Sequence, residues 1–133
     1  MSATSQNARP RENLKILYDY QLKNAPGKSM IGLQVEYPPG GFTPSHRHGG
    51  ATVVANVIEG AVLSGMNGNP PQVYEAGEHF MELPGCHHTV SENNSTTQNA
   101  KMIAVLVVDT EVVKQGGYAA LTVFDDDSLN GPR

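Results

Sequence analysis

Hydrophobic and polar positions alternate along much of the chain, in short runs that end at turn residues. The clearest run extends from Met30 to Tyr37, where every second residue from Ile31 onward is apolar. Alternation with a period of two predicts a half-buried β-strand, because successive side chains of a strand point to opposite faces. A nearly continuous apolar run from Met102 to Val108 is too short for a typical helix and predicts a buried strand.

Turn residues separate the remaining apolar runs at intervals of about eight to twelve residues, which is the rhythm of a β-sandwich or barrel. The 14 glycines and 9 prolines among 133 residues also disfavour long helices. We therefore expect a single all-β domain, since a chain of this length builds one core. Further strands are predicted over Leu14 to Leu22, Thr52 to Ile58, Ala61 to Met66, Gln72 to Tyr74, Glu78 to Leu83 and His87 to Ser91, with an extended segment from Phe42 to His48.

The two ends of the chain differ in composition from the middle. Residues 1–13 are polar and are predicted to form a flexible N-terminal arm that orders only against a partner. Residues 125–133 begin with three aspartates and form an acidic C-terminal tail. The predicted domain therefore spans residues 14–124.

Charge and composition exclude several functional classes. The 9 lysines and arginines are outnumbered by 13 aspartates and glutamates, and they form no basic stripe, so nucleic-acid binding is not expected. No apolar stretch approaches the roughly 18 to 20 residues that span a bilayer, and the N-terminus lacks the apolar segment of a secretion signal. Cys86 is the single cysteine and has no partner for an internal disulfide. These features predict a cytoplasmic protein.

The histidines are the most informative feature of the sequence. All five lie between positions 46 and 88. His46 and His48 are two residues apart, so on an extended segment both side chains point to the same face and can bind one metal ion. His88 follows the turn at Pro84-Gly85 and is placed to supply a third ligand.

These residues fall in a pattern that resembles the two motifs of the cupin family. Gly40, the His46-Arg47-His48 triplet and the closing Gly60 match the first motif. The second motif is matched by Gly77, by Pro84 to His88 and by Asn93. The resemblance implies a cupin-type double-stranded β-helix, a jelly-roll barrel, with His46, His48 and His88 as metal ligands at one mouth.

The resemblance also implies a class of function. Cupins include dioxygenases, isomerases, lyases and cyclases, and a centre of this type takes Fe, Mn, Ni or Zn. We therefore expect an enzyme that acts on a small oxygen-rich molecule, such as an enolisable carbonyl, a phenol or a carboxylate. A cupin that binds or senses a small molecule without turnover is the alternative. Small cupins also leave sheet edges and apolar faces that a second copy covers, which predicts a homodimer.

One position departs from the cupin pattern. Where the family presents a glutamate ligand, this chain has Thr52 or Val53, depending on the length of the gap. Three neutral imidazoles would leave a divalent ion its full charge, and such a site would favour anionic substrates. Thr52 is accordingly a predicted substrate contact.

Two polar residues on predicted strands are further candidates. Glu82 would replace the missing carboxylate, or act as a general base, if its side chain points into the barrel; otherwise it is a solvated strand residue. Asn56 lies within the apolar run from Val53 to Ile58, so it either faces solvent or binds the substrate, because an unpaired amide is costly to bury.

Overall fold

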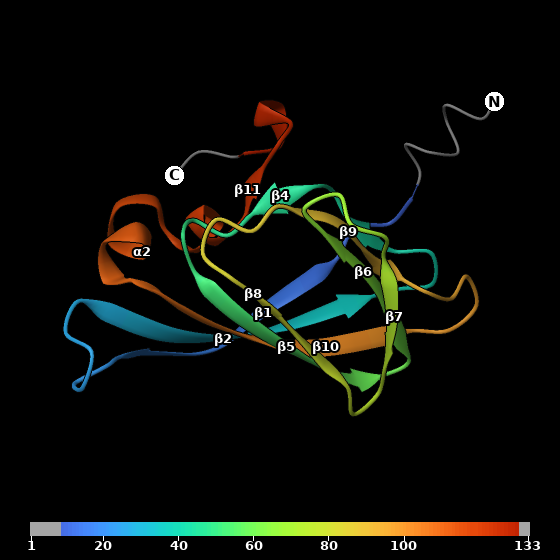
Figure 1. The fold of residues 1–133 in the computed structure, drawn as a ribbon, viewed down its shortest axis with the longest axis horizontal. Coiled ribbons are helices and arrows are strands. Elements are labelled where there is room, and N and C mark those ends of the chain that lie inside the picture. The colour runs from blue at the N-terminus through green and yellow to red at the C-terminus, as the bar shows by residue number, and fades with distance from the viewer. Residues whose placement is uncertain (1–8, 131–133) are drawn as a thin grey trace.

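The computed structural model describes residues 9–130, which fold into two antiparallel sheets facing each other as a flattened barrel (Figure 1). The predicted all-β jelly-roll fold is confirmed. One sheet has five strands in the order β1-β2-β10-β5-β8. Its strands are β1 (Asn13–Gln21), β2 (Lys28–Tyr37), β5 (Thr52–Glu59), β8 (His79–Glu82) and β10 (Ala100–Asp109).

The other sheet has six strands and contains both histidine motifs. Its order is β11-β4-β9-β6-β7, and β3 also pairs with β9. Its strands are β3 (Phe42–Thr43), β4 (His46–Arg47), β6 (Ala61–Met66), β7 (Gln72–Glu75), β9 (His88–Asn93) and β11 (Val123–Phe124). Because β4 pairs with β9, His46 lies directly opposite His88 in the register.

Short helical segments follow the last long strand. They are α2 (Thr110–Gly116) and two 3-10 helices, η1 (Tyr118–Leu121) and η2 (Asp127–Leu129). In Figure 1, α2 lies at the left, above the β1–β2 end of the five-stranded sheet. No helix within residues 9–130 is long and apolar enough to cross a membrane.

The strands agree closely with the alternation of the sequence. The predicted strand from Ala61 to Met66 has those bounds as β6, and the others differ by a few residues at their ends. The segment from Phe42 to His48 is not continuous, because it divides into β3 and β4 around Pro44, whose ring removes a backbone donor.

The core lies between the sheets and is supplied mainly by the five-stranded one. Every second residue points inward along β2 from Ser29, along β5 from Val53 to Val57 and along β10, and each of these residues exposes at most 7% of its surface. The apolar residues involved are Ile31, Leu33, Val35, Tyr37, Val53, Ala55, Val57, Ala100, Met102, Ala104, Leu106 and Val108. They form an apolar wall opposite the histidines.

Gly60 makes the tight connection from β5 to β6. Its backbone has φ of +70°, a conformation that side chains with a Cβ rarely adopt, and a Cβ there would overlap the carbonyl oxygen of Asn99. The backbone conformation and the nearby Asn99 carbonyl therefore explain why a glycine closes the first motif.

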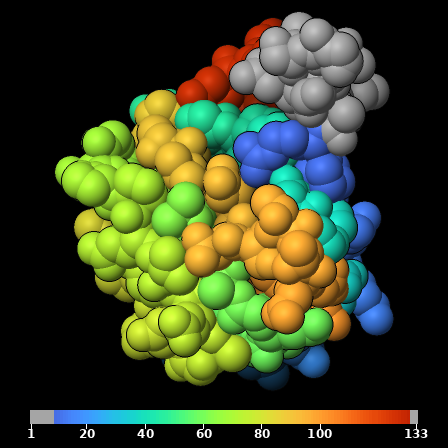
Figure 2. All heavy atoms as spheres, turned by 90° about the vertical axis from the view of Figure 1, so that its right-hand side faces the viewer, coloured from blue at the N-terminus to red at the C-terminus, as the bar shows by residue number. Residues whose placement is uncertain are grey.

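The described part of the N-terminal arm packs on its own barrel. The backbone N–H of Phe42 donates to the carbonyl of Pro10, and Arg11 forms a bridge with Phe42. Figure 2 shows the blue N-terminal segment lying against the cyan residues that follow β2. Residues 1–8 of the predicted arm lie outside the described residues, and the barrel itself orders residues 9–12.

Candidate metal centre

The structure brings the three predicted metal ligands together inside the barrel. His46 lies on β4, His48 follows it, and His88 begins β9. One ring nitrogen from each lies within 4.8 Å of the others. His46 and His88 expose 3% and 2% of their surface, and the His48 side chain exposes 15%, so the cluster is largely shielded from bulk water.

Backbone carbonyls orient two of the imidazole rings. Nδ1 of His46 donates to the carbonyl of Pro44 at 2.6 Å, and Nδ1 of His48 donates to that of Leu121 at 2.9 Å. Each ring therefore presents the lone pair of Nε2, and these two Nε2 atoms are 3.2 Å apart. Two facing lone pairs at this distance require a cation, either a metal ion or a proton.

Glu82 points into the barrel beside the histidines. Alternation along β8 buries Phe80 and Glu82, with 5% and 2% exposed, and places His79 and Met81 outside. Oε1 of Glu82 lies 3.3 Å from Nε2 of His48 and 3.4 Å from Nδ1 of His88. The sequence did not decide which face of this strand points inward, and the structure shows that the face with Glu82 does.

Two buried polar atoms of this cluster have no hydrogen-bond partner among the described residues. They are Oε1 of Glu82 and Nδ1 of His88. Nε2 of His88 bonds the buried hydroxyl of Ser64 at 2.8 Å, which leaves the lone pair of Nδ1 directed at the centre. Unsatisfied buried polar atoms are rare, and here both are typical ligand atoms for a transition metal, so the residues fit a metal ion.

The electrostatics of the cluster follow from burial and from Glu82. Burial, together with the neighbouring His48 and His88, lowers the pKa of His46 to about 3. Burial also lowers the pKa of His88. Burial opposes charge on His48 as well, but the close contact with Glu82 and the charge of its carboxylate outweigh burial and raise the pKa of His48. The same contact overcomes burial at Glu82 and lowers the pKa of its carboxyl. His48 and Glu82 thus favour each other's charged form.

Thr52 and Asn56 do not lie in the site, and the expectation that they contact substrate is wrong for this cavity. Both lie on the outward face of β5, where Thr52 is half-buried and Asn56 is exposed, whereas Val53 points inward. Val53 and Glu82 are register partners on β5 and β8. The carboxylate thus comes from the strand beside the position that the family pattern would use.

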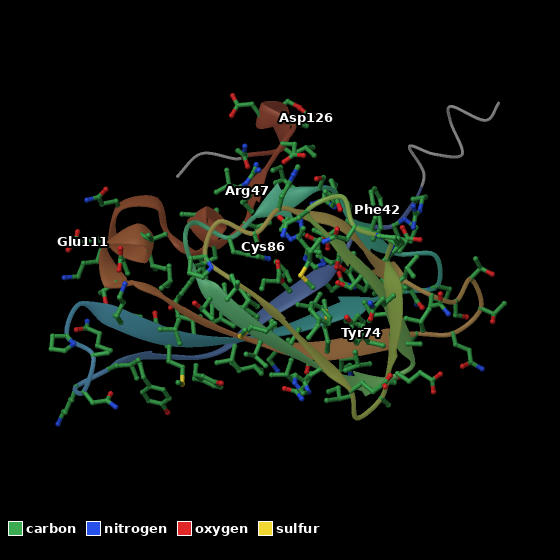
Figure 3. All side chains as sticks on the ribbon, in the orientation of Figure 1. Phe42, Arg47, Tyr74, Cys86, Glu111 and Asp126 are labelled. Atoms are coloured by element: carbon green, nitrogen blue, oxygen red, sulfur yellow. The ribbon has the colours of Figure 1, made fainter. Side chains whose placement is uncertain are left out.

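The other histidine, cysteine and asparagine residues of the two motifs lie outside the cluster of metal ligands. His87 lies outside the cluster and bonds Ser45 and Asp125 through Nε2. Burial and the charge of Glu82 raise the pKa of the Cys86 thiol, so the reactive thiolate is disfavoured. The amide of Asn93 donates to the carbonyls of three other residues and fixes the loop after β9. In Figure 3, Arg47 lies on β4 close to the C-terminal turn that carries Asp126.

A cavity adjoins the three histidines and Glu82. The cavity has a volume of about 40 Å³, enough for a metal ion with a small ligand or a few waters. Apolar side chains of β2, β5 and β10 form one side of the wall. Three buried hydroxyls interrupt it: Tyr37 bonds Thr43 at 2.6 Å and Ser91 at 2.7 Å.

Sequence reasoning missed three groups that support the ligands. Ser64 bonds His88, the Leu121 carbonyl accepts from His48, and the Phe124 ring lies 6.1 Å from that of His46. The alternation of β6 indicates that Ser64 faces inward with Val62, which was a usable signal. Phe124 is placed by the pairing of β11 with β4, and Leu121 ends the 3-10 helix η1 just before β11; no local pattern encodes either contact.

Comparison with known proteins is consistent with this geometry. A family model described as "Cupin domain" matches residues 33–108, a range that includes all three histidines and Glu82. No curated protein matches the sequence.

Solved structures share the fold. A double-stranded β-helix protein from Klebsiella pneumoniae superposes with a TM-score of 0.63 over 80% of this chain and 87% of its own, at 16% identity. The DMSP lyase DddQ from Ruegeria pomeroyi has a TM-score of 0.60 at 20% identity, covering 76% of this chain and 49% of that one. An oxalate oxidase in complex with the substrate analogue glycolate has a TM-score of 0.55 at 25% identity; 77% of this chain covers 56% of it.

Proposed function

The chain belongs to the cupin domain family, and on that premise we propose that it is a metal-dependent enzyme that acts on a small oxygen-rich molecule. One observation carries the proposal. Unpartnered ligand atoms of Glu82 and His88 and the facing lone pairs of His46 and His48 converge in one buried cavity. Structurally similar proteins include an oxidase in complex with glycolate and a lyase, and both kinds of chemistry are consistent with such a centre.

The chain's own residues have distinct roles in this proposal. His46, His48 and His88 hold a divalent ion of Fe, Mn, Ni or Zn, and Glu82 is the fourth ligand because its Oε1 lies beside the ligand nitrogens of two histidines. The bound ion would supply Lewis acidity toward a carbonyl, enolate or carboxylate oxygen. Pro44, Leu121 and Ser64 fix the rings, and the apolar wall excludes water.

Glu82 changes the charge that was expected of the centre. With a carboxylate among the ligands, the net charge is one unit lower than with three neutral imidazoles. A monoanionic substrate oxygen would neutralise the remaining charge within the low-dielectric barrel. Small monoanions, or molecules that lose one proton on binding, are therefore the favoured substrate class.

The experiment is metal analysis of protein purified without added metal, followed by titration with each candidate ion. We expect near-stoichiometric binding that is lost in His46→Ala and in His88→Ala. His79→Ala is the matched control, because His79 lies in the same part of the sequence but is exposed on the outer face of β8. Oxygen consumption by the loaded protein then separates a dioxygenase from a lyase or isomerase.

A cupin that binds small molecules without metal or turnover is the second candidate. The contact between His48 and Glu82 favours it, because Glu82 favours a proton on His48 and that proton would supply a cation to the facing nitrogens. Wild-type protein that binds none of the candidate ions would support this alternative and contradict the metal-dependent enzyme.

We also propose that the chain forms a homodimer through β1. This strand is an edge of the five-stranded sheet, and it exposes 52% of Leu14, 40% of Leu17 and 63% of Tyr20. A second copy offers the same unpaired edge, so two β1 strands can pair about a twofold axis and cover these side chains.

A further inference from the structure

A second carboxylate lines the cavity, and the site described above does not use it. It belongs to Glu12, which immediately precedes β1. The Glu12 side chain exposes only 6% of its surface, although its neighbours Arg11 and Asn13 are exposed. No histidine motif or strand pattern marks this residue.

Arg11 holds this carboxylate from the solvent side. Its Nε donates to Oε1 of Glu12 at 2.9 Å, and its Nη2 donates to Oε2 at 3.3 Å. The guanidinium lies 4.9 Å from the centre of the Phe124 ring, on the C-terminal segment that also packs against His46. Arg11 remains 40% exposed and does not line the cavity, so only the carboxylate faces inward.

A carboxylate has room for more than the two hydrogen bonds that Arg11 donates, since its two oxygens accept up to about four. The remaining acceptor capacity of Glu12 faces a cavity whose wall is mostly apolar. Burying a charged group in such surroundings costs free energy unless a partner compensates for it. A ligand with a hydrogen-bond donor near Glu12 would use this remaining capacity, whereas a second anionic group in the cavity would face the Glu12 carboxylate and not the Arg11 guanidinium, which does not line the cavity.

We propose that Glu12 is a specificity-determining residue, which selects substrates that carry a hydroxyl or amino donor within reach of its carboxylate and rejects dianions. This inference rests on the proposed function, because the metal centre fixes the anionic end of the substrate. The preferred ligand is then a small monoanion with a neutral or cationic donor that reaches Glu12. A diacid of the same length is excluded, because its second carboxylate would approach Glu12.

The test uses the protein loaded with Co²⁺, whose visible absorption reports both metal occupancy and anion binding. Two matched probe pairs are titrated: 3-hydroxypropanoate against malonate, and 4-hydroxybutanoate against succinate. The measured quantity is the ratio of the dissociation constants within each pair, for wild type and for Glu12→Gln, which keeps the size of the side chain and removes its charge. The intrinsic chelating strength of each probe cancels in this comparison.

Glu92→Gln is the control variant. Glu92 pairs with Arg9 on the same N-terminal segment at 3.6 Å, but its side chain is 32% exposed and does not line the cavity. We expect Glu12→Gln to shift the ratio toward the diacid by about tenfold in at least one pair, as loss of a like charge near the ligand predicts. Glu92→Gln is expected to leave both ratios at the wild-type value.

The outcomes separate this inference from the proposed function. If wild type and variants bind Co²⁺ but Glu12→Gln changes neither ratio by more than twofold, the role of Glu12 is wrong and the metal site stands. An equal shift in Glu92→Gln would also overturn it, because the effect would then be a general one of surface charge. If wild type binds no Co²⁺, the proposed metal-dependent function fails, and the inference fails with it. Thermal unfolding of each variant verifies that it is folded at the temperature of the titration.

Discussion

The two sheets of the barrel bury very different side chains. The inward positions of the five-stranded sheet are apolar along β2, β5 and β10, apart from the residues at the ends of β2. The inward positions of the six-stranded sheet are largely polar and include two of the histidines. Its buried polar residues are Thr43, His46, Ser64, His88, Ser91 and Asn93.

This difference shows how one small core supports both stability and a site. Apolar burial is the main source of stabilisation, whereas each buried polar group must recover its lost hydration through a partner. The six-stranded sheet satisfies this with buried hydroxyl partners: Ser64 bonds His88, and Thr43 and Ser91 bond the Tyr37 hydroxyl of the opposite sheet. Glu82 is a buried carboxylate on the apolar sheet, and it lies where it faces the histidines across the barrel.

The largest expected effect is the loss of stability when the apolar sheet is truncated. Ile31→Ala removes a side chain that is 0% exposed and does not line the cavity. We expect the free energy of unfolding to fall by about 2–5 kcal/mol, as is typical of large-to-small substitutions in a core. Chemical denaturation measures it, and Ile58→Ala, at a position 51% exposed, is the control with little expected change. A similar loss in both variants would contradict the assignment of Ile31 to the core.

The second prediction moves the carboxylate between neighbouring strands. Glu82→Val is expected to weaken metal binding about 100-fold or more, because it removes a ligand from the centre. The double variant Val53→Glu/Glu82→Val returns a carboxylate to the inward register partner, where side chains are about 5 Å apart. We expect it to recover affinity to within about tenfold of wild type in a metal titration.

The matched control for this exchange is Thr52→Glu/Glu82→Val. Thr52 precedes Val53 but points outward, so a glutamate there does not reach the centre, and no recovery is expected. Recovery in this control, or wild-type affinity in Glu82→Val, would show that Glu82 is not a ligand.

The third prediction concerns support of a ligand by the polar sheet. Ser64→Ala removes the hydroxyl that bonds Nε2 of His88, and we expect metal affinity to fall about tenfold, at the lower end of the range for residues that orient a ligand. Ser91→Ala is the control: Ser91 is the register partner of Ser64 and is equally buried, but its hydroxyl bonds Tyr37. Equal losses in the two variants would indicate a general packing defect.

The apolar sheet is also the part of the fold that the sequence encodes most directly. Alternation along residues 30–37 and 52–58 predicts those strands and their inward faces, because side-chain direction has a period of two. The spacing of His46, His48 and His88 likewise predicts the ligand cluster. The position of Glu82 depends on which face of β8 is buried, and neither face of Glu78 to Leu83 is uniformly apolar, so the pattern could not decide it. Glu12 is set by the packing of the chain end, which leaves no periodic signal.

The smallest effect on the metal centre is expected from a change at the free edge of the apolar sheet. Leu17→Lys places a charge on β1, where Leu17 is 40% exposed, at the irregularity in the pairing of β1 with β2. A lysine on an edge strand opposes pairing with another edge, so we expect sedimentation to change from a mass about twice the chain's 14.2 kDa to a mass near 14.2 kDa.

Leu129→Lys is the matched control, since Leu129 is 39% exposed but lies on η2 and not on β1. It is expected to leave the mass and the metal affinity unchanged, and Leu17→Lys is expected to change the mass alone. Wild type that sediments as a single chain at micromolar concentration would refute the dimer, whereas dissociation in both variants would place the contact at a surface other than β1.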